Sequence, residues 1–178
     1  MALVARFRPA GHSPRKLPLR RLAPCPCGYF GDASGRCGCS PDQVARYRSR
    51  VSGPLWDRID LQLDVPRVPL SELNAPGSAG EPSASVRARV QMARGRALAR
   101  AGKPNVALAN AEVERDCVLG ERERRLLERA VDRLGLSARA YHRILRVARS
   151  IADLADVPLI DGAHVAEAIQ FRRVQGHV

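Results

Sequence analysis

Residues 137–156, with the sequence SARAYHRILRVARSIADLAD, decide the fold of this chain. The apolar residues of this stretch recur at steps of four and three: Ala140, Ile144, Val147, Ile151 and Leu154. This spacing places them on one face of an α-helix, and Ser137 is a residue type whose hydroxyl can cap the free amides at a helix start. The stretch therefore predicts an amphipathic helix that packs against other helices.

Further helices are predicted on both sides of this stretch, from caps, helical periodicity and stop signals. They run from Ser40 to about Arg50, from Ser83 or Ser85 to about Ala101, from Asn110 to Val118, from Glu121 to Leu134, and from Asp161 to about Arg173. Aromatic residues make up 4% of the chain against 45% apolar residues, so the core must be built from aliphatic side chains and alanine. These features predict a mainly α fold.

One strand is predicted over residues 59–65. Ile59, Leu61, Leu63 and Val65 alternate with polar residues, and period two is typical of a half-buried strand. Residues 71–82 are rich in turn-forming residues and are predicted to be a linker. Residues 1–24 contain four prolines and six basic residues with no acid, so we expect an irregular or disordered arm without regular elements.

The charge points to a polyanionic partner. The formal net charge is +12 over 178 residues, and the first 50 residues hold ten Lys and Arg against two Asp, a net of +8. A basic segment of this kind suits nucleic acid or nucleotide phosphates. No run is long and apolar enough for a membrane helix and no signal peptide is recognisable, so we expect a cytoplasmic protein with free or metal-bound thiols.

The cysteines offer a candidate metal site. Residues 25–39 read CPCGYFGDASGRCGC, which places two CxC pairs on a glycine-rich loop: Cys25, Cys27, Cys37 and Cys39. Four thiolates can hold a tetrahedral zinc ion, although the usual spacing is CxxC. The alternative is a reduced, glycine-rich surface loop. The fifth cysteine, Cys117, lies among apolar residues of a predicted helix and is expected to be a core residue.

Sites for nucleotide hydrolysis are incomplete in this sequence. A phosphate-binding loop of the form GxxxxGK[ST] is absent, and so is an apolar strand that ends in paired acids able to hold magnesium. We therefore expect no nucleotide hydrolysis by the chain alone. The histidines are isolated from one another and are interpreted as surface or core residues rather than ligands: His12, His142, His164 and His177.

Two arginines are candidate anion-binding residues. Arg58 follows a turn in SGPLWDRID, residues 52–60, and precedes the predicted strand, so its guanidinium would project from a fixed backbone; the alternative is a salt bridge with Asp57 or Asp60. Arg139 lies in the first turn of its helix, where the dipole and free amides favour an anion. The alternative for Arg139 is a solvated surface arginine.

These motifs together resemble a known family. PCPCGYFGD, CGCS, Arg46-Tyr47, SGPLWDRIDLQLDVPRV and LSARAYHRILRVARSIADLADVPLIDGAHVAEAIQFR resemble the C-terminal half of the magnesium-chelatase-like AAA+ ATPases of the ComM/YifB type, over about residues 24–174. The resemblance implies a remnant of an AAA+ α/β core over residues 25–70, with one or two strands, the cysteine loop and the arginine turn. It also implies an all-α lid and C-terminal domain over residues 83–174.

The resemblance implies roles for both arginines. Arg58 matches the family's arginine finger, which reaches the nucleotide of the neighbouring subunit in a hexameric ring, with Trp56 where leucine is usual. Arg139 matches the second sensor, which contacts the γ-phosphate. ATP and magnesium are the implied cofactors, and DNA and homologous AAA+ subunits are the implied partners. The implied activity is ATP-driven branch migration of DNA in recombination and natural transformation.

The sequence also departs from the family. Ala23 stands where the family carries an asparagine sensor, residues 1–23 resemble no part of the family, and the Walker A and Walker B segments do not precede them. These departures suggest a truncated or frameshifted C-terminal portion of a ComM-like ATPase that is inactive alone. A non-enzymatic nucleic-acid-binding module and a chelatase accessory subunit are the alternative functions.

Overall fold

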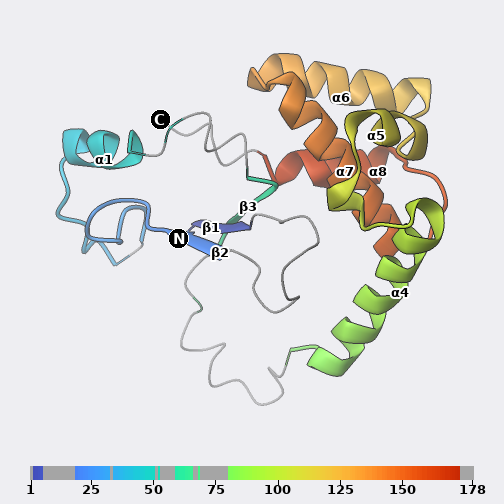
Figure 1. The fold of residues 1–178 in the computed structure, drawn as a ribbon. Coiled ribbons are helices and arrows are strands. Elements are labelled where there is room, and N and C mark those ends of the chain that lie inside the picture. Colours follow the sequence, from blue (N-terminus) through green and yellow to red (C-terminus); the bar gives the residue numbers. More distant parts are fainter. Residues whose placement is uncertain are drawn as a thin grey trace. The chain divides into compact units, whose positions relative to one another are not determined.

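The computed structural model describes residues 2–5, 19–32, 34–50, 52, 59–65, 68 and 80–172 (Figure 1). The chain divides into two compact units, which are described separately. The first comprises residues 1–7, 14–78 and 174–178, and the second comprises residues 8–13 and 79–173. Helices dominate the described residues, so the predicted mainly α fold is confirmed.

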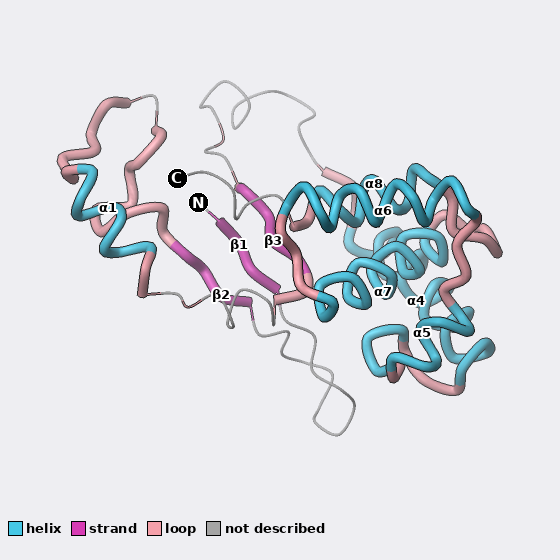
Figure 2. Tube along the Cα trace, turned by 90° about the horizontal axis from the view of Figure 1, so that it is seen from above, coloured by secondary structure: helices cyan, strands magenta, loops and turns pink. Residues whose placement is uncertain are grey.

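The second unit is a bundle of helices, shown in cyan in Figure 2. Its elements are α4 (Ser83–Ala101), the 3-10 helix η1 (Asn105–Ala107), α5 (Asn110–Asp116), α6 (Glu121–Leu134), α7 (Ala138–Leu154) and α8 (Gly162–Gln170). Each of the other elements in this unit contacts α7. The stretch that the sequence singled out is thus the central helix of the unit.

The core of this unit follows the predicted apolar stripe. Ala140 and Ile144 of α7 are buried, and the partly buried Val147 and Ile151 pack against the apolar core to which Ile144 belongs. Leu154 is 43% exposed, so its predicted inward position is wrong. Leu154 is the last residue of α7, where the neighbouring helices no longer cover the stripe.

Capping residues fix the ends of α7 and its neighbours. The Ser137 hydroxyl accepts a hydrogen bond from the Ala140 amide at 3.2 Å, as predicted. Asp161 accepts hydrogen bonds from the amides of Ala163 and His164 at the start of α8. Gly135 ends α6 in the left-handed conformation with φ 59°, a region that costs little only for glycine.

The first unit holds a three-stranded antiparallel sheet with strand order β2-β1-β3. Its strands are β1 (Ala2–Ala5), β2 (Leu19–Leu22) and β3 (Leu61–Asp64), and the helix α1 (Pro41–Arg48) belongs to the same unit. The expectation that residues 1–24 lack regular elements is wrong, because β1 and β2 lie there. Pairing with β1 gives the backbone amides and carbonyls of β3 partners that a lone strand would lack.

Strand β3 confirms the predicted strand, but of the four residues expected on its apolar face only Ile59, which is 5% exposed, is fully buried. Gln62 is 2% exposed, whereas Leu61 and Leu63 are half-buried and Val65 is 39% exposed. Alternation shows that the two faces of a strand differ, and it does not show which face the rest of the molecule covers. Among the described residues, no helix combines the length and the apolar character needed to cross a membrane.

Candidate functional site

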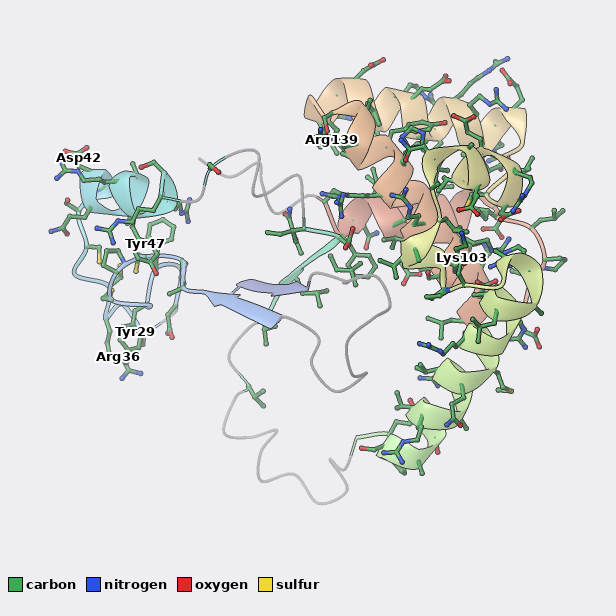
Figure 3. All side chains as sticks on the ribbon, viewed as in Figure 1. Tyr29, Arg36, Asp42, Tyr47, Lys103 and Arg139 are labelled. Carbon is green, nitrogen blue, oxygen red and sulfur yellow. The ribbon has the colours of Figure 1, made fainter. Side chains whose placement is uncertain are left out.

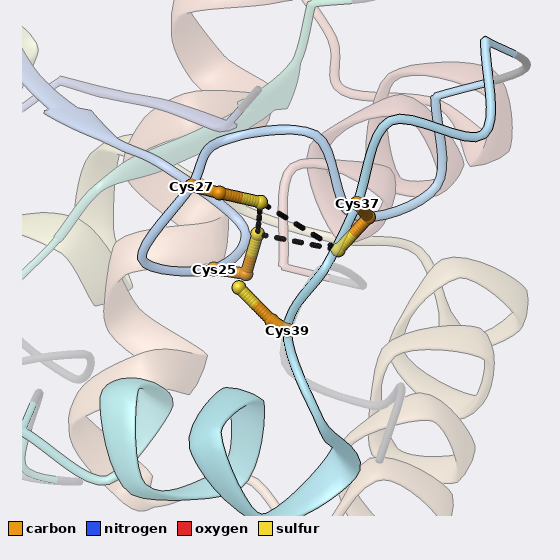
Figure 4. A group of neighbouring side chains, drawn as sticks. All are labelled: Cys25, Cys27, Cys37 and Cys39. Carbon is orange, nitrogen blue, oxygen red and sulfur yellow. Dashed lines mark hydrogen bonds between the residues drawn. The ribbon is translucent and has the colours of Figure 1, made fainter.

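The four predicted cysteines converge on one point of the first unit. The Sγ atoms of Cys25, Cys27, Cys37 and Cys39 all lie within 4.8 Å of one another (Figure 4). Cys25 lies 3.3 Å from Cys27 and 3.8 Å from Cys37, measured between sulfur atoms. Tetrahedral thiolates bound at about 2.3 Å from a metal would stand about 3.8 Å apart. The cluster can therefore hold a metal ion.

Tight turns and the helix α1 bring the two CxC pairs together. The Gly28 amide donates to the Cys25 carbonyl at 3.1 Å, and Gly28 adopts φ 82°. The second pair leads directly into α1, where Ser40 and Gln43 form a reciprocal capping box. Arg48 at the end of α1 donates to the Pro24 carbonyl at 3.3 Å, which ties the helix to the start of the loop.

Hydrogen bonds and charges within the cluster shift the pKa of Cys25 and Cys39 in opposite directions. Burial opposes ionisation of Cys25, yet hydrogen bonds from the Cys27 thiol, the Phe30 amide and the other two thiols outweigh it and lower the pKa of Cys25 to about 6. A backbone hydrogen bond from Cys27 favours the Cys39 thiolate, but the Cys27 thiol, burial and the Cys25 charge raise the pKa of Cys39 to about 11. The Cys25 thiolate therefore forms readily, whereas the raised pKa values of Cys37 and Cys39 disfavour their thiolates unless a bound cation stabilises them.

The candidate sensor Arg139 lies at the exposed start of α7 (Figure 3). It lines a hollow of about 350 Å³ together with Asn110, Ala138, His142, Arg143 and Arg146. The steps from 139 to 143 to 146 place the three guanidiniums on one face of the helix. The hollow thus combines three positive side chains with the free amides of a helix N-terminus, an arrangement that suits an anion.

Arg146 also holds the wall of this hollow. Its guanidinium donates to the Leu108 carbonyl from Nε at 3.1 Å and from Nη2 at 2.8 Å. The same Nη2 lies 3.1 Å from Asn110 Oδ1. Arg146 therefore fixes the segment between η1 and α5 against α7, and with it the position of Asn110.

Of the remaining residues that the sequence singled out, some lie outside the described residues and Cys117 lies in the helical core. Arg58, Trp56, His12 and His177 lie outside the described residues. Cys117 is 3% exposed within the helical core, as predicted, and burial raises the pKa of its thiol to about 11.

The two described histidines make local hydrogen bonds. His142 Nδ1 lies 3.0 Å from the Ala138 carbonyl, within its own helix. His164 Nδ1 accepts a hydrogen bond from the Asp161 amide at 3.1 Å in the cap of α8.

Sequence reasoning missed a buried charged network between α4 and α7. Asp153 is 2% exposed and accepts from Arg100 Nη2 at 2.7 Å and from Asn105 Nδ2 at 2.8 Å. Arg149 lies one turn before Asp153, with its Nε 3.2 Å from the carboxylate, and donates to the carbonyls of Val157 and Pro158. The signal in the sequence was an Arg and an Asp four residues apart, each preceded by an inward-facing alanine.

Comparison with known proteins matches this chain to two family models. A family model described as magnesium chelatase, subunit ChlI C-terminal, matches residues 80–172, and a model described as magnesium chelatase, subunit ChlI, matches residues 12–73. The second match includes residues 12–23, so the expectation that residues 1–23 resemble no part of the family is wrong for these positions.

Three relatives are similar to this chain over most of its length. The competence protein ComM of Haemophilus influenzae is 46% identical over 151 residues, which cover 85% of this chain and 29% of that protein. YifB of Salmonella typhimurium is 40% identical and YifB of Escherichia coli 39% identical, each over 153 residues that cover 86% of this chain and 30% of the relative. The chain thus spans about 30% of the length of these relatives, and it belongs to the magnesium-chelatase-like family of the ComM and YifB type.

Proposed function

We propose that this chain is the C-terminal portion of a ComM-like AAA+ ATPase and that its helical unit is the lid over the nucleotide. The observation that carries the proposal is the hollow at the start of α7, where Arg139 lies beside Arg143 and Arg146. Guanidiniums next to free helix amides stabilise phosphate oxygens, and their positive charge matters most as charge develops during phosphoryl transfer. Arg139 is the residue that would contact the γ-phosphate.

The proposal assigns Arg58 to the nucleotide site of a neighbouring subunit. The family resemblance supports this role, since an arginine supplied in trans stabilises the transferring phosphoryl group and raises hydrolysis by about 10³–10⁵-fold. ATP and Mg²⁺ would be held by segments that the relatives carry beyond the region matched here. Several such subunits would assemble into a ring that acts on DNA in the cytoplasm as a motor for branch migration. The isolated chain would not turn over ATP.

A chimera tests the lid role. The segment of Haemophilus influenzae ComM that aligns with this chain over 151 residues is replaced by this chain, and ATP turnover is measured. Arg139→Ala should lower turnover at least about 100-fold, the scale for losing one donor to a developing charge. Arg94→Ala, an exposed arginine of α4 that lies outside the hollow, is the matched control and should leave the rate unchanged. Equal rates for both variants would remove the support for the proposal.

We propose further that zinc occupies the cysteine cluster and staples the loop to α1. The four thiols provide the donor set and the spacing that tetrahedral zinc requires, and the loop between them has few apolar residues to hold it otherwise. Elemental analysis of the purified chain should give one zinc per chain, and Cys37→Ser should lose most of it. Wild-type chain that binds no zinc after refolding with excess metal would contradict this role.

A further inference from the structure

The cysteine loop and α1 carry an unusual share of the aromatic residues of this chain. The whole sequence has seven Phe, Tyr and Trp residues, and Tyr29, Phe30 and Tyr47 fall within the 15 residues of the loop and the eight residues of α1. Tyr29 is 38% exposed and Phe30 is 45% exposed. The two rings are neighbours in sequence, on the turn that closes the first CxC pair.

Each of these rings is paired with an arginine. The guanidinium carbon of Arg36 lies 4.9 Å from the centroid of Tyr29, and that of Arg48 lies 4.9 Å from the centroid of Phe30. Figure 3 labels Tyr29 and Arg36 on the cysteine loop. Arg50 lies 5.9 Å from the centroid of Tyr47. We define these six side chains, Tyr29, Phe30, Tyr47, Arg36, Arg48 and Arg50, as the ring–arginine surface.

We propose that the ring–arginine surface binds single-stranded nucleic acid. Exposed aromatic faces stack on unpaired bases, and arginines beside them contact the phosphates or extend the stack. Bases within a duplex are already stacked and present no free face to a ring, so the surface selects single strands. The inference deepens the proposed DNA-directed function and rests on the proposed zinc site, which would hold the two rings in place.

Charge favours nucleic acid over a protein partner. The surface lies within the first 50 residues, whose net charge is +8. Among the described residues between 23 and 50, Tyr29 and Phe30 are the exposed large apolar side chains, so no aliphatic patch surrounds the rings. A protein interface would be expected to have a largely apolar core at its centre.

A zinc ion in the cysteine cluster would weaken the salt dependence of nucleic-acid binding. A zinc ion with four thiolates carries two negative charges, which offset part of the arginine charge beside it. Each phosphate contact on a single strand contributes about 0.7 to the salt slope, so three arginines give a slope of about −2 in log–log form. Stacking must therefore supply much of the affinity.

Fluorescence anisotropy of the zinc-loaded full chain with a labelled dT15 strand tests the proposal. Tyr29→Ala with Phe30→Ala should weaken binding by at least about tenfold, since stacking contributes about 1–3 kcal/mol per base. Tyr29→Phe with Phe30→Tyr keeps both rings and should retain the affinity. Leu159→Ala removes an exposed apolar side chain of the second unit, 73% exposed, and is the matched control.

Four outcomes would overturn the proposal. The double alanine variant could bind dT15 as tightly as the wild type at equal zinc content, a 15-base-pair duplex could bind as tightly as the strand, or the zinc-loaded chain could fail to bind dT15. The double alanine variant could also change the oligomeric state in light scattering without changing dT15 affinity, which would make the surface a protein interface. Zinc content is measured separately, and ATP turnover of the chimera depends on Arg139, so a failure here is distinct from a failure of the proposed function.

Discussion

Asp153 of α7 joins α4 through a buried carboxylate. It is buried, and its carboxylate meets Arg100, Asn105 and Arg149. Asp153→Asn removes the negative charge and leaves two guanidiniums without their counter-ion, which should lower the free energy of unfolding by about 3–5 kcal/mol. Urea denaturation followed by circular dichroism measures this loss.

The nearby Asp156 provides the matched control for that substitution. Asp156 pairs with Arg96, its side chain is 72% exposed, and asparagine tolerates its positive φ of 61° as readily as aspartate does. An exposed ion pair contributes about 0–1 kcal/mol, so Asp156→Asn should be nearly neutral. Equal losses for the two variants would show that the buried network does not hold the helices together.

The contribution of Asp153 should depend on pH. Burial raises the pKa of this carboxyl, but hydrogen bonds from Arg100 and Asn105 and the charge of Arg149 outweigh it, so the pKa in the folded protein lies below the ordinary value of 3.8. The unfolded chain therefore takes up the proton first as pH falls, and the stabilisation is complete above pH 3.8 and lost below it. The difference between wild type and Asp153→Asn should be constant from pH 7 to 5 and shrink below pH 3.8 in urea titrations.

Single residues were predicted from the sequence where local spacing carried the information. Two CxC pairs on one short loop made a four-cysteine site one of two alternatives, and the structure brings the four sulfur atoms together. The four-residue spacing of Arg149 and Asp153 did not reveal the whole network, because the partner Arg100 lies 53 residues from Asp153 in the sequence and reaches it only when α4 packs on α7. Ion pairs between distant elements depend on tertiary structure that periodicity does not specify.

Glycine is required at the end of one helix of this protein and is replaceable in the interior of another. Gly135 ends α6 at φ 59°, whereas Gly95 lies in the exposed interior of α4 with open space where a Cβ would go. Gly135→Ala should destabilise the helical unit by about 1–2 kcal/mol, while Gly95→Ala should stabilise it by about 0.5–1 kcal/mol. Thermal unfolding of both variants checks the opposite signs; a stabilising Gly135→Ala would contradict the assigned cap.

Helices were predicted better than strands because their signals are local. The predicted helix over residues 121–134 matches α6, and the helix predicted from Ser83 or Ser85 matches α4. Strands β1 and β2 have four residues each, too few for a pattern, and each exists through pairing in the antiparallel sheet. Helix predictions have a similar limit. The spacing of Leu154 predicted an inward position, but Leu154 is 43% exposed, because tertiary packing decides where the buried face of a helix ends.

The two units of the molecule should respond differently to loss of metal. Zinc would hold residues 25–39 and α1, whereas the helical unit has its own apolar core. Chelation should speed amide hydrogen exchange in residues 23–50 by at least about tenfold and leave residues 105–170 unchanged, as followed by mass spectrometry. Uniform protection before and after complete zinc removal would show that the cysteines do not staple the loop.

Whole-molecule function could be predicted from the sequence only through resemblance. Arg139 lies in a hollow lined by Arg143 and Arg146 at a capped helix start, and the charge of this hollow follows from the chain itself. The role proposed for Arg58 depends on a nucleotide held by another subunit, and no property of a single chain can specify that partner. The relatives are more than three times as long as the matched segment, so the complete site must be tested in an assembled protein.

Subunit mixing tests the central proposal most directly. One chimera with Haemophilus influenzae ComM carries Arg58→Ala. A second carries an alanine in place of the lysine of the phosphate-binding loop that the family resemblance implies for the host, so each chimera should be inactive alone. Mixed rings place an intact Arg58 beside an intact phosphate-binding loop, and ATP turnover should recover in proportion to mixed assembly. A mixture that assembles into mixed rings yet stays inactive, or an Arg58→Ala chimera that turns over ATP at the unmodified rate, would contradict the account.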